Sequence, residues 1–137
     1  MPSTSSDAGF GAWAPYGLGL LRIMAALLFL EHGLMKLFHF PAAGGAPDPL
    51  PMLLLAAAII ELVGGVLVAL GLFTRLAAFL CSGQMAVGYF TAHMPHSFWP
   101  GLNGGDAAIL FCFIFLYLTF AGPGAWSVDG VLRSRTA

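Results

Sequence analysis

Long apolar segments with almost no charges constrain the fold of this chain more than any other feature. An α-helix needs ~20 residues to cross ~30 Å of hydrocarbon. Four stretches of about that length are rich in Leu, Ala, Ile and Phe: residues 17–38, 50–73, 75–93 and 106–121. Membrane strands would instead alternate apolar and polar residues over ~10 positions. Only 8% of the residues are charged, against about 25% in soluble domains. The sequence therefore predicts an all-α membrane protein, a bundle of four transmembrane helices.

The basic residues predict the orientation of this bundle. Arg22, Arg75, Arg133 and Arg135 fall at one face of the membrane, and Lys36 alone falls toward the other. Because Lys and Arg are concentrated in cytoplasmic segments, we expect both termini and the short turn between the second and third helices in the cytoplasm. The two longer loops are then periplasmic, and the protein lies in a bacterial inner membrane as a multi-pass protein.

Two tails flank the predicted membrane domain of residues 17–121. Residues 1–16 lack the positive n-region of a secretory signal, so we expect this N-terminal tail to stay in the mature protein. Residues 122–137 form the C-terminal tail. The chain has no basic stretch that would bind nucleic acid. Cys81 and Cys112 lie in apolar runs without the spacing of a zinc, iron–sulfur or haem site, so no metal or haem is expected.

Several polar residues lie inside the predicted spans, where a charge at the bilayer centre costs at least ~2.5–3.5 kcal/mol. At ~1.5 Å per residue, most of them fall in one slab, the periplasmic half of the membrane. We therefore expect a polar pocket inside the bundle that opens toward the periplasm. The candidate proton-relay residues are Glu61, His32 and His93. The candidate ligand-binding residues are Lys36, Gln84, Glu31, Arg22 and Asp106.

Each of these residues also has a purely structural interpretation. Glu61 is expected to be neutral, or paired with Lys36 or with a histidine, because an unpaired carboxylate at that depth is unfavourable. Glu31 falls on a different face of its helix from Lys36. Arg22 is most simply an anchor whose side chain reaches the cytoplasmic interface. Asp106 follows Asn-Gly-Gly at the start of the fourth helix, where an acid favours the helix N-terminus.

Five short motifs occur in a distinctive order along the chain. They are HGLMKLF at 32–38, ELVGG at 61–65, LGLFTR at 70–75, NGGD at 103–106 and AGPG at 121–124. Together they resemble the DoxX family over about residues 16–130. The resemblance implies a four-helix inner-membrane protein related to subunits of thiosulfate:quinone oxidoreductase. The family's recurring polar positions fall here on Arg22, His32, Lys36, Glu61, Arg75, His93 and Asp106. Asp106 stands where members often have Glu, so a carboxylate is kept with a shorter reach.

Two main functions stay open at this point. In the first, the protein is a component of a quinone-linked oxidoreductase, and an apolar slot holds a quinone beside the proton-relay residues. In the second, it is a non-catalytic accessory or assembly subunit of a larger, respiratory-type membrane complex. A transporter is disfavoured, because neither an inverted repeat nor an interrupted helix is evident. In each case the expected partners are the lipid bilayer and either further copies of the chain or a partner membrane or redox protein.

Overall fold

The computed structural model describes residues 9–137, and within them all regular structure is helical. The long helices are α2 (Ala14–Phe38), α3 (Met52–Leu70), α4 (Thr74–Gly88) and α6 (Asp106–Ala121). The short elements are the π-helix η1 (Tyr89–His93), the 3-10 helix η2 (Met94–His96), α5 (Pro100–Asn103) and α7 (Val128–Thr136). Residues 1–8 of the expected N-terminal tail lie outside the described residues.

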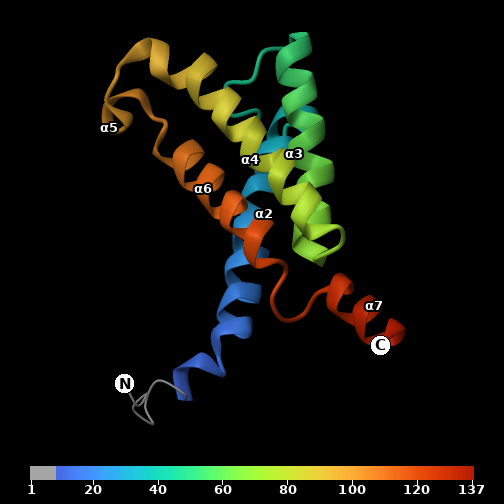
Figure 1. Ribbon diagram of the computed structural model, residues 1–137. Coiled ribbons are helices and arrows are strands. Elements are labelled where there is room, and N and C mark those ends of the chain that lie inside the picture. The colour runs from blue at the N-terminus through green and yellow to red at the C-terminus, as the bar shows by residue number, and fades with distance from the viewer. Residues whose placement is uncertain (1–8) are drawn as a thin grey trace.

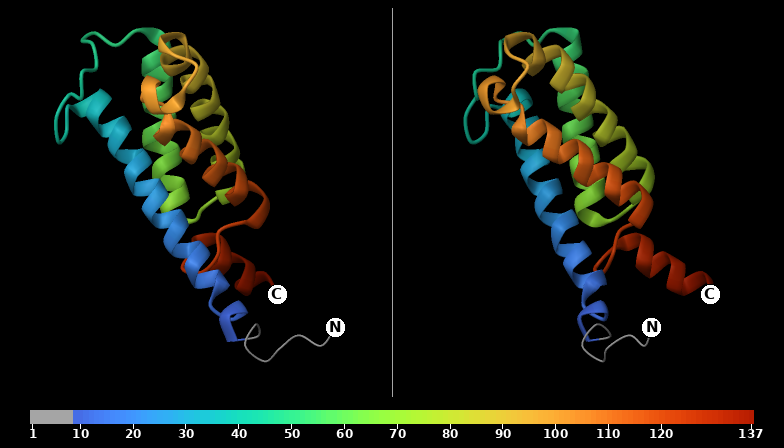
Figure 2. Two further views of the ribbon diagram at one scale, coloured as in Figure 1. Left: turned by 90° about the vertical axis from the view of Figure 1, so that its left-hand side faces the viewer. Right: turned by 60° about the vertical axis from the view of Figure 1, so that its left-hand side comes forward.

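The long helices pack as two pairs, α2 with α3 and α4 with α6, and α3 also contacts α4. Figure 1 shows the chain passing up α2, down α3, up α4 and down α6. The start of α2, the turn between α3 and α4, and α7 lie at one end of the molecule, which we call the turn end. Segments 39–51 and 94–105 lie at the opposite end, which we call the loop end (Figure 2).

Glycines let α2 and α3 approach each other closely. A Cβ atom at Gly33 would lie 2.9 Å from the backbone nitrogen of Leu62, and one at Gly65 would lie 3.0 Å from the Cβ atom of Leu30. Neither position has room for a side chain. Small residues at such contacts are typical of membrane helices, because close backbone packing drives their association.

The buried core lies where the two helix pairs meet, and the outer surface is apolar. Phe29 of α2 packs edge-on against Phe115 of α6, with ring centroids 4.8 Å apart, and small residues of α3 and α4 complete this cluster. Large apolar side chains stay exposed on all four long helices, among them Leu20 (60% exposed) and Phe120 (73% exposed). An apolar surface of this extent is suited to contact with lipid.

Length separates these helices into two groups. Within the described residues, two helical segments are long and apolar enough to cross a membrane, Gly9–Phe38 and Met52–Leu70. Helix α6 is apolar but shorter, and the expected third span, 75–93, divides into α4 and the π-helix η1. The all-helical fold is therefore confirmed, whereas the four spans and the cytoplasmic termini stay predictions.

Some helix ends differ from the expected bounds. Helix α3 ends at Leu70 and not at Phe73, because Gly71 adopts a left-handed conformation (φ 67°) that stops the helix. The C-terminal tail contains a helix, α7, that the sequence did not predict. Its start is capped by the hydroxyl of Ser127, which accepts a hydrogen bond from the backbone N–H of Gly130.

A buried arginine connects the segment after α6 to the turn end of α2. Arg22 is 0% exposed, so the expectation that its side chain reaches the membrane interface is wrong. Its guanidinium donates hydrogen bonds to three backbone carbonyl groups, those of Pro123, Ala125 and Trp126. These acceptors follow the fourth long helix, far from Arg22 in the sequence. Arg22 therefore holds α2 and the segment after α6 together.

Two further side chains reinforce this end, and we call Arg22, Arg75 and Asp129 the clasp. Arg75 donates to carbonyl groups in the last turn of α6. The Asp129 carboxylate accepts from the backbone N–H groups of Phe73 and Thr74, at 2.9 Å each, and so caps the start of α4. Burial alone raises the pKa of Asp129, but these N–H groups and the positive charge of Arg133 outweigh it, so the pKa of this carboxyl is lowered.

Asp129→Ala is expected to lower the free energy of unfolding by about 1 kcal/mol, the usual contribution of a helix N-cap. Because the pKa of Asp129 is lowered by folding, its contribution is complete above the ordinary aspartate pKa of the unfolded chain. It is lost as the pH falls through the lower pKa of the folded state. Denaturant unfolding in nanodiscs should therefore show a difference from wild type at neutral pH that vanishes in acid. Asp48→Ala, in an exposed loop, is the control, and a difference independent of pH would contradict the capping role.

Candidate functional site

A cavity of about 680 Å³ lies between the two helix pairs, in the half of the protein nearer the loop end. Its walls are mostly apolar and come from all four long helices and from η1. The lining includes Phe29 of α2, Ala57 of α3, Gly83 of α4 and Phe111 of α6. Ligand sites in proteins are typically concave, mostly apolar and of ~300–1,000 Å³, with a few polar groups that orient the ligand.

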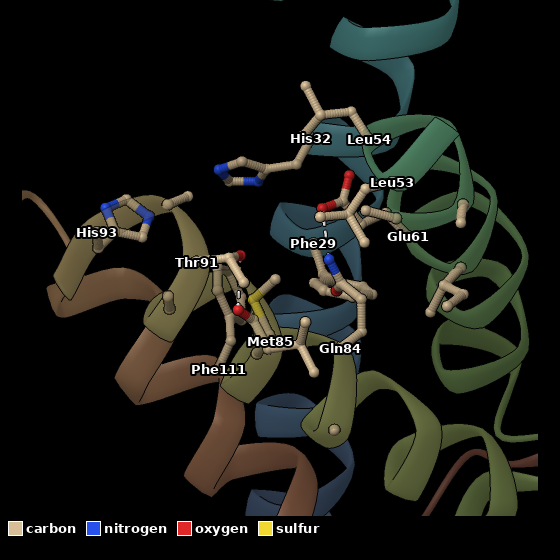
Figure 3. Close-up of a pocket in the computed structure, with 18 of the residues that line it drawn as sticks. Phe29, His32, Leu53, Leu54, Glu61, Gln84, Met85, Thr91, His93 and Phe111 are labelled. Atoms are coloured by element: carbon tan, nitrogen blue, oxygen red, sulfur yellow. Dashed lines mark hydrogen bonds between the residues drawn. The ribbon is translucent and has the colours of Figure 1, made fainter. Parts of the chain in front are cut away.

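One polar cluster, Lys36, Glu61 and Gln84, interrupts the apolar wall. The ammonium group of Lys36 donates to both carboxylate oxygens of Glu61, at 2.6 Å each. Nε2 of Gln84 donates to Oε1 of Glu61 at 3.3 Å (Figure 3). The three residues come from α2, α3 and α4, so the cluster joins the two helix pairs. Of the partners that the sequence left open for Glu61, the structure selects Lys36.

The members of this cluster differ in their access to the cavity. Glu61 is 1% exposed, whereas the side chain of Lys36 is 22% exposed. An ammonium group has three N–H bonds, and Glu61 takes two of them, which leaves one for a ligand. The Gln84 amide is fixed in orientation, because reversing it would place its oxygen against the carboxylate. Its Oε1 atom is buried and has no hydrogen-bond partner among the described residues.

Two histidines line the cavity from opposite helix pairs. Nδ1 of His32, on α2, lies 2.8 Å from the carbonyl oxygen of Leu28. Nδ1 of His93, at the end of η1, lies 3.1 Å from the carbonyl oxygen of Asn103. Figure 3 shows both rings pointing into the cavity. The second ring nitrogen of each histidine, Nε2, is therefore the one that faces a ligand.

Asn103 positions His93, and the sequence did not predict it as a site residue. It is 8% exposed. Its Nδ2 donates to the carbonyl of Ser97 and to the hydroxyl of Tyr89, and its Oδ1 accepts from the backbone N–H of Gly105. The ring of Tyr89 stacks on His93. This network folds segment 97–105 back onto η1, and the Asn-Gly-Gly sequence, which favours a tight turn, is its signal.

The structure brings part of the predicted set together at this cavity: Glu61, Lys36, Gln84, His32 and His93. The other predicted residues do not line it. Arg22 belongs to the clasp at the turn end. Asp106 is exposed in the first turn of α6, where its charge favours the helix N-terminus. Glu31 is half-buried on another face of α2.

Comparisons with known proteins identify the family. Residues 17–94 match the DoxX family model. An uncharacterized protein of Haemophilus influenzae is 43% identical over 125 residues, which cover 85% of this chain and 91% of the relative. The inner membrane protein YphA of Escherichia coli is 31% identical over 138 residues, which cover 88% and 93%. An uncharacterized membrane protein of Mycobacterium tuberculosis is 28% identical over 142 residues, which cover 90% and 86%. No solved structure matches the chain. The chain is a membrane protein and belongs to the DoxX family.

Proposed function

We propose that the protein is a multi-pass protein of the bacterial inner membrane that binds a quinone in its cavity and acts as a component of a quinone-linked oxidoreductase. The observation that carries this proposal is the chemistry of the cavity walls. They are mostly apolar, and they present the ammonium group of Lys36 and the imidazoles of His32 and His93. An apolar slot with a few hydrogen-bonding groups is what a quinone ring requires.

Four spans with cytoplasmic termini are part of this proposal. Helices α4 and η1 together run without a gap from Thr74 to His93, which at ~1.5 Å per residue approaches the ~30 Å of a hydrocarbon core. The clasp arginines and those of α7 lie at the turn end, and Lys36 lies toward the loop end. The positive-inside rule then supports a cytoplasmic turn end and a cavity in the periplasmic half of the membrane.

The cavity residues have distinct roles toward a bound quinone, which itself supplies two-electron, two-proton chemistry. Phe29, Phe111 and Met85 give the ring apolar contact. The free N–H of Lys36 donates a hydrogen bond to a ring oxygen. His32 and His93 lie nearer the loop end and exchange protons between the ring oxygens and the aqueous phase.

The ligand reaches the cavity from the lipid. Leu53 of α3 and Leu80 of α4 both line the cavity, and they are 60% and 55% exposed. The cavity therefore opens between α3 and α4 toward the apolar surroundings of the bundle. A quinone with a long hydrocarbon tail is dissolved in the membrane core, so this opening lets the ring enter while the tail stays in lipid.

Filling this opening tests the proposal. Gly83 lines the cavity, and a Cβ atom there would have no neighbour within 4 Å, so Gly83→Leu adds a large side chain to the cavity wall at a position where its first atom meets no clash. Gly17→Leu is the matched control, because Gly17 is equally open but does not line the cavity. We expect wild type and Gly17→Leu to retain quinone in nanodiscs, measured by mass spectrometry, and Gly83→Leu to retain roughly tenfold less.

The same purification distinguishes the quinone-linked function from the alternative, a non-catalytic accessory or assembly subunit. If wild type retains no quinone above empty nanodiscs and instead co-elutes with a stoichiometric protein partner, the quinone proposal fails. The chain would then be an accessory or assembly subunit, and the Lys36–Glu61 pair would be a contact that stabilises the bundle. Equal quinone retention by Gly83→Leu and wild type would place the quinone outside this cavity.

A further inference from the structure

The cavity has a directional hydrogen-bonding pattern that its occupant must match. Nδ1 of His32 faces the carbonyl oxygen of Leu28, and Nδ1 of His93 faces the carbonyl oxygen of Asn103. A carbonyl oxygen only accepts hydrogen bonds, so each Nδ1 must carry the proton. A neutral imidazole has one donor and one acceptor nitrogen. Both histidines therefore present Nε2 to the cavity as an acceptor.

Lys36 is the complementary donor. The hydroxyl of Thr91, which also lines the cavity, donates to the carbonyl of Val87, so toward a ligand its oxygen is a further acceptor. The carboxylate of Glu61 is 1% exposed and accepts from two donors. Nε2 of Gln84 is one of these donors, and its Oε1 is buried. A ligand in the cavity thus meets acceptors from His32 and His93 and a donor from Lys36.

The two redox forms of a quinone differ in whether their ring oxygens can donate hydrogen bonds. The oxidised ring carries two carbonyl oxygens, which only accept, so it can pair with Lys36 but leaves both histidine acceptors facing another acceptor. The reduced ring carries two hydroxyl groups, each of which donates and accepts. It can donate to His32 or His93 and still accept from Lys36. Placing unmatched polar groups against each other in an apolar site is unfavourable.

We propose that the cavity binds the dihydroxy form of the ring more tightly than the dione form. This inference rests on the proposed quinone site and specifies which form of the ligand that site selects. One added hydrogen bond of ordinary strength corresponds to roughly a tenfold difference in affinity. The selection resides in His32 and His93, whereas Lys36 contributes to the binding of both forms.

The test compares three ligands of nearly equal size in nanodiscs: decylubiquinone, decylubiquinol and the dimethyl ether of decylubiquinol, which has lost both hydroxyl donors. Retained ligand is measured by mass spectrometry under anaerobic conditions. We expect the quinol to bind roughly tenfold more tightly than the other two. His32→Phe and His93→Phe should reduce this preference, while His96→Phe, outside the cavity, should keep it.

Nitrogen-15 NMR of histidine-labelled wild-type protein measures which ring nitrogen of each histidine carries the proton. This second test does not require any variant to fold. Wild-type protein without ligand should show His32 and His93 protonated at Nδ1. Protonation at Nε2 would overturn the inference, and so would equal binding of quinone and quinol, although the quinone site itself would stand in both cases. Binding of none of the three ligands above empty nanodiscs would overturn the proposed function as well.

Discussion

Lys36→Met is expected to lower the free energy of unfolding by about 3–5 kcal/mol, the usual cost of removing one partner from a buried ion pair. Glu61 is 1% exposed, and Lys36 binds both of its carboxylate oxygens at 2.6 Å. Without Lys36 the carboxylate must stay charged without a counter-ion or take up a proton, and both are costly in an apolar bundle. The amide of Gln84 remains as a donor but brings no charge. Unfolding in mixed detergent micelles measures the loss.

The double variant Lys36→Met/Glu61→Leu is expected to recover most of this loss, because exchanging both partners of a buried pair for apolar residues is often neutral. Glu31→Gln is the matched control on the same helix. Glu31 is half-buried, and among the described residues its side chain forms no hydrogen bond, so its neutralisation should change the free energy of unfolding by less than about 0.5 kcal/mol. An unchanged stability of Lys36→Met would mean that the pair contributes nothing to folding.

Contacts among the polar residues can be predicted because polar residues stand out in apolar membrane spans. Glu61, Lys36 and Gln84 stand in apolar runs on three helices within the same half of the membrane, and a charge inside the membrane needs a partner. Polar residues that share one half of the membrane are therefore predicted to lie near one another, whatever the order of the helices around the bundle. A shared half of the membrane does not by itself place a residue at the cavity. Glu31 lies five residues from Lys36 on a different face of the helix, and it does not line the cavity.

The contacts of the clasp could not be predicted from the sequence in the same way. The sequence treats Arg22 as a charge between lipid and water, whereas its partners are backbone carbonyl groups more than a hundred positions away. Every residue has a backbone carbonyl group, so the residue types do not indicate which carbonyl groups accept from Arg22. Helix α7 was missed for a related reason, since it is short and polar and is tied to the turn end by Asp129 and by its own N-cap. Local apolar patterns therefore predict the long helices but not what joins their ends.

Arg22→Met is expected to destabilise the protein by about 3–6 kcal/mol, because it removes several charge-assisted hydrogen bonds at once and leaves buried carbonyl groups without donors. The segment that these bonds hold is also strained. Gly122, Gly124 and Trp126 all have positive φ values, which is unfavourable for a residue with a side chain such as Trp126 (φ 55°). Without the guanidinium, this segment keeps the backbone hydrogen bond from Ala125 to Pro15 and the contact between the rings of Trp126 and Tyr16, but no charged group joins it to α2.

Hydrogen–deuterium exchange shows where the effect of Arg22→Met is located. The backbone N–H of Ala125 donates to the carbonyl of Pro15, and that of Asp129 donates to the carbonyl of Gly71. Both amides should exchange faster in the variant, while amides in the middle of α3 stay protected. Arg135→Met removes the same charge from the exposed end of α7 and should leave both exchange and stability nearly unchanged. Arg22→Lys restores the charge but not the fork of donors, so it should recover only part of the stability. Full recovery by lysine would show that the charge of Arg22, and not its hydrogen bonds to the backbone, holds α2 and the segment after α6 together.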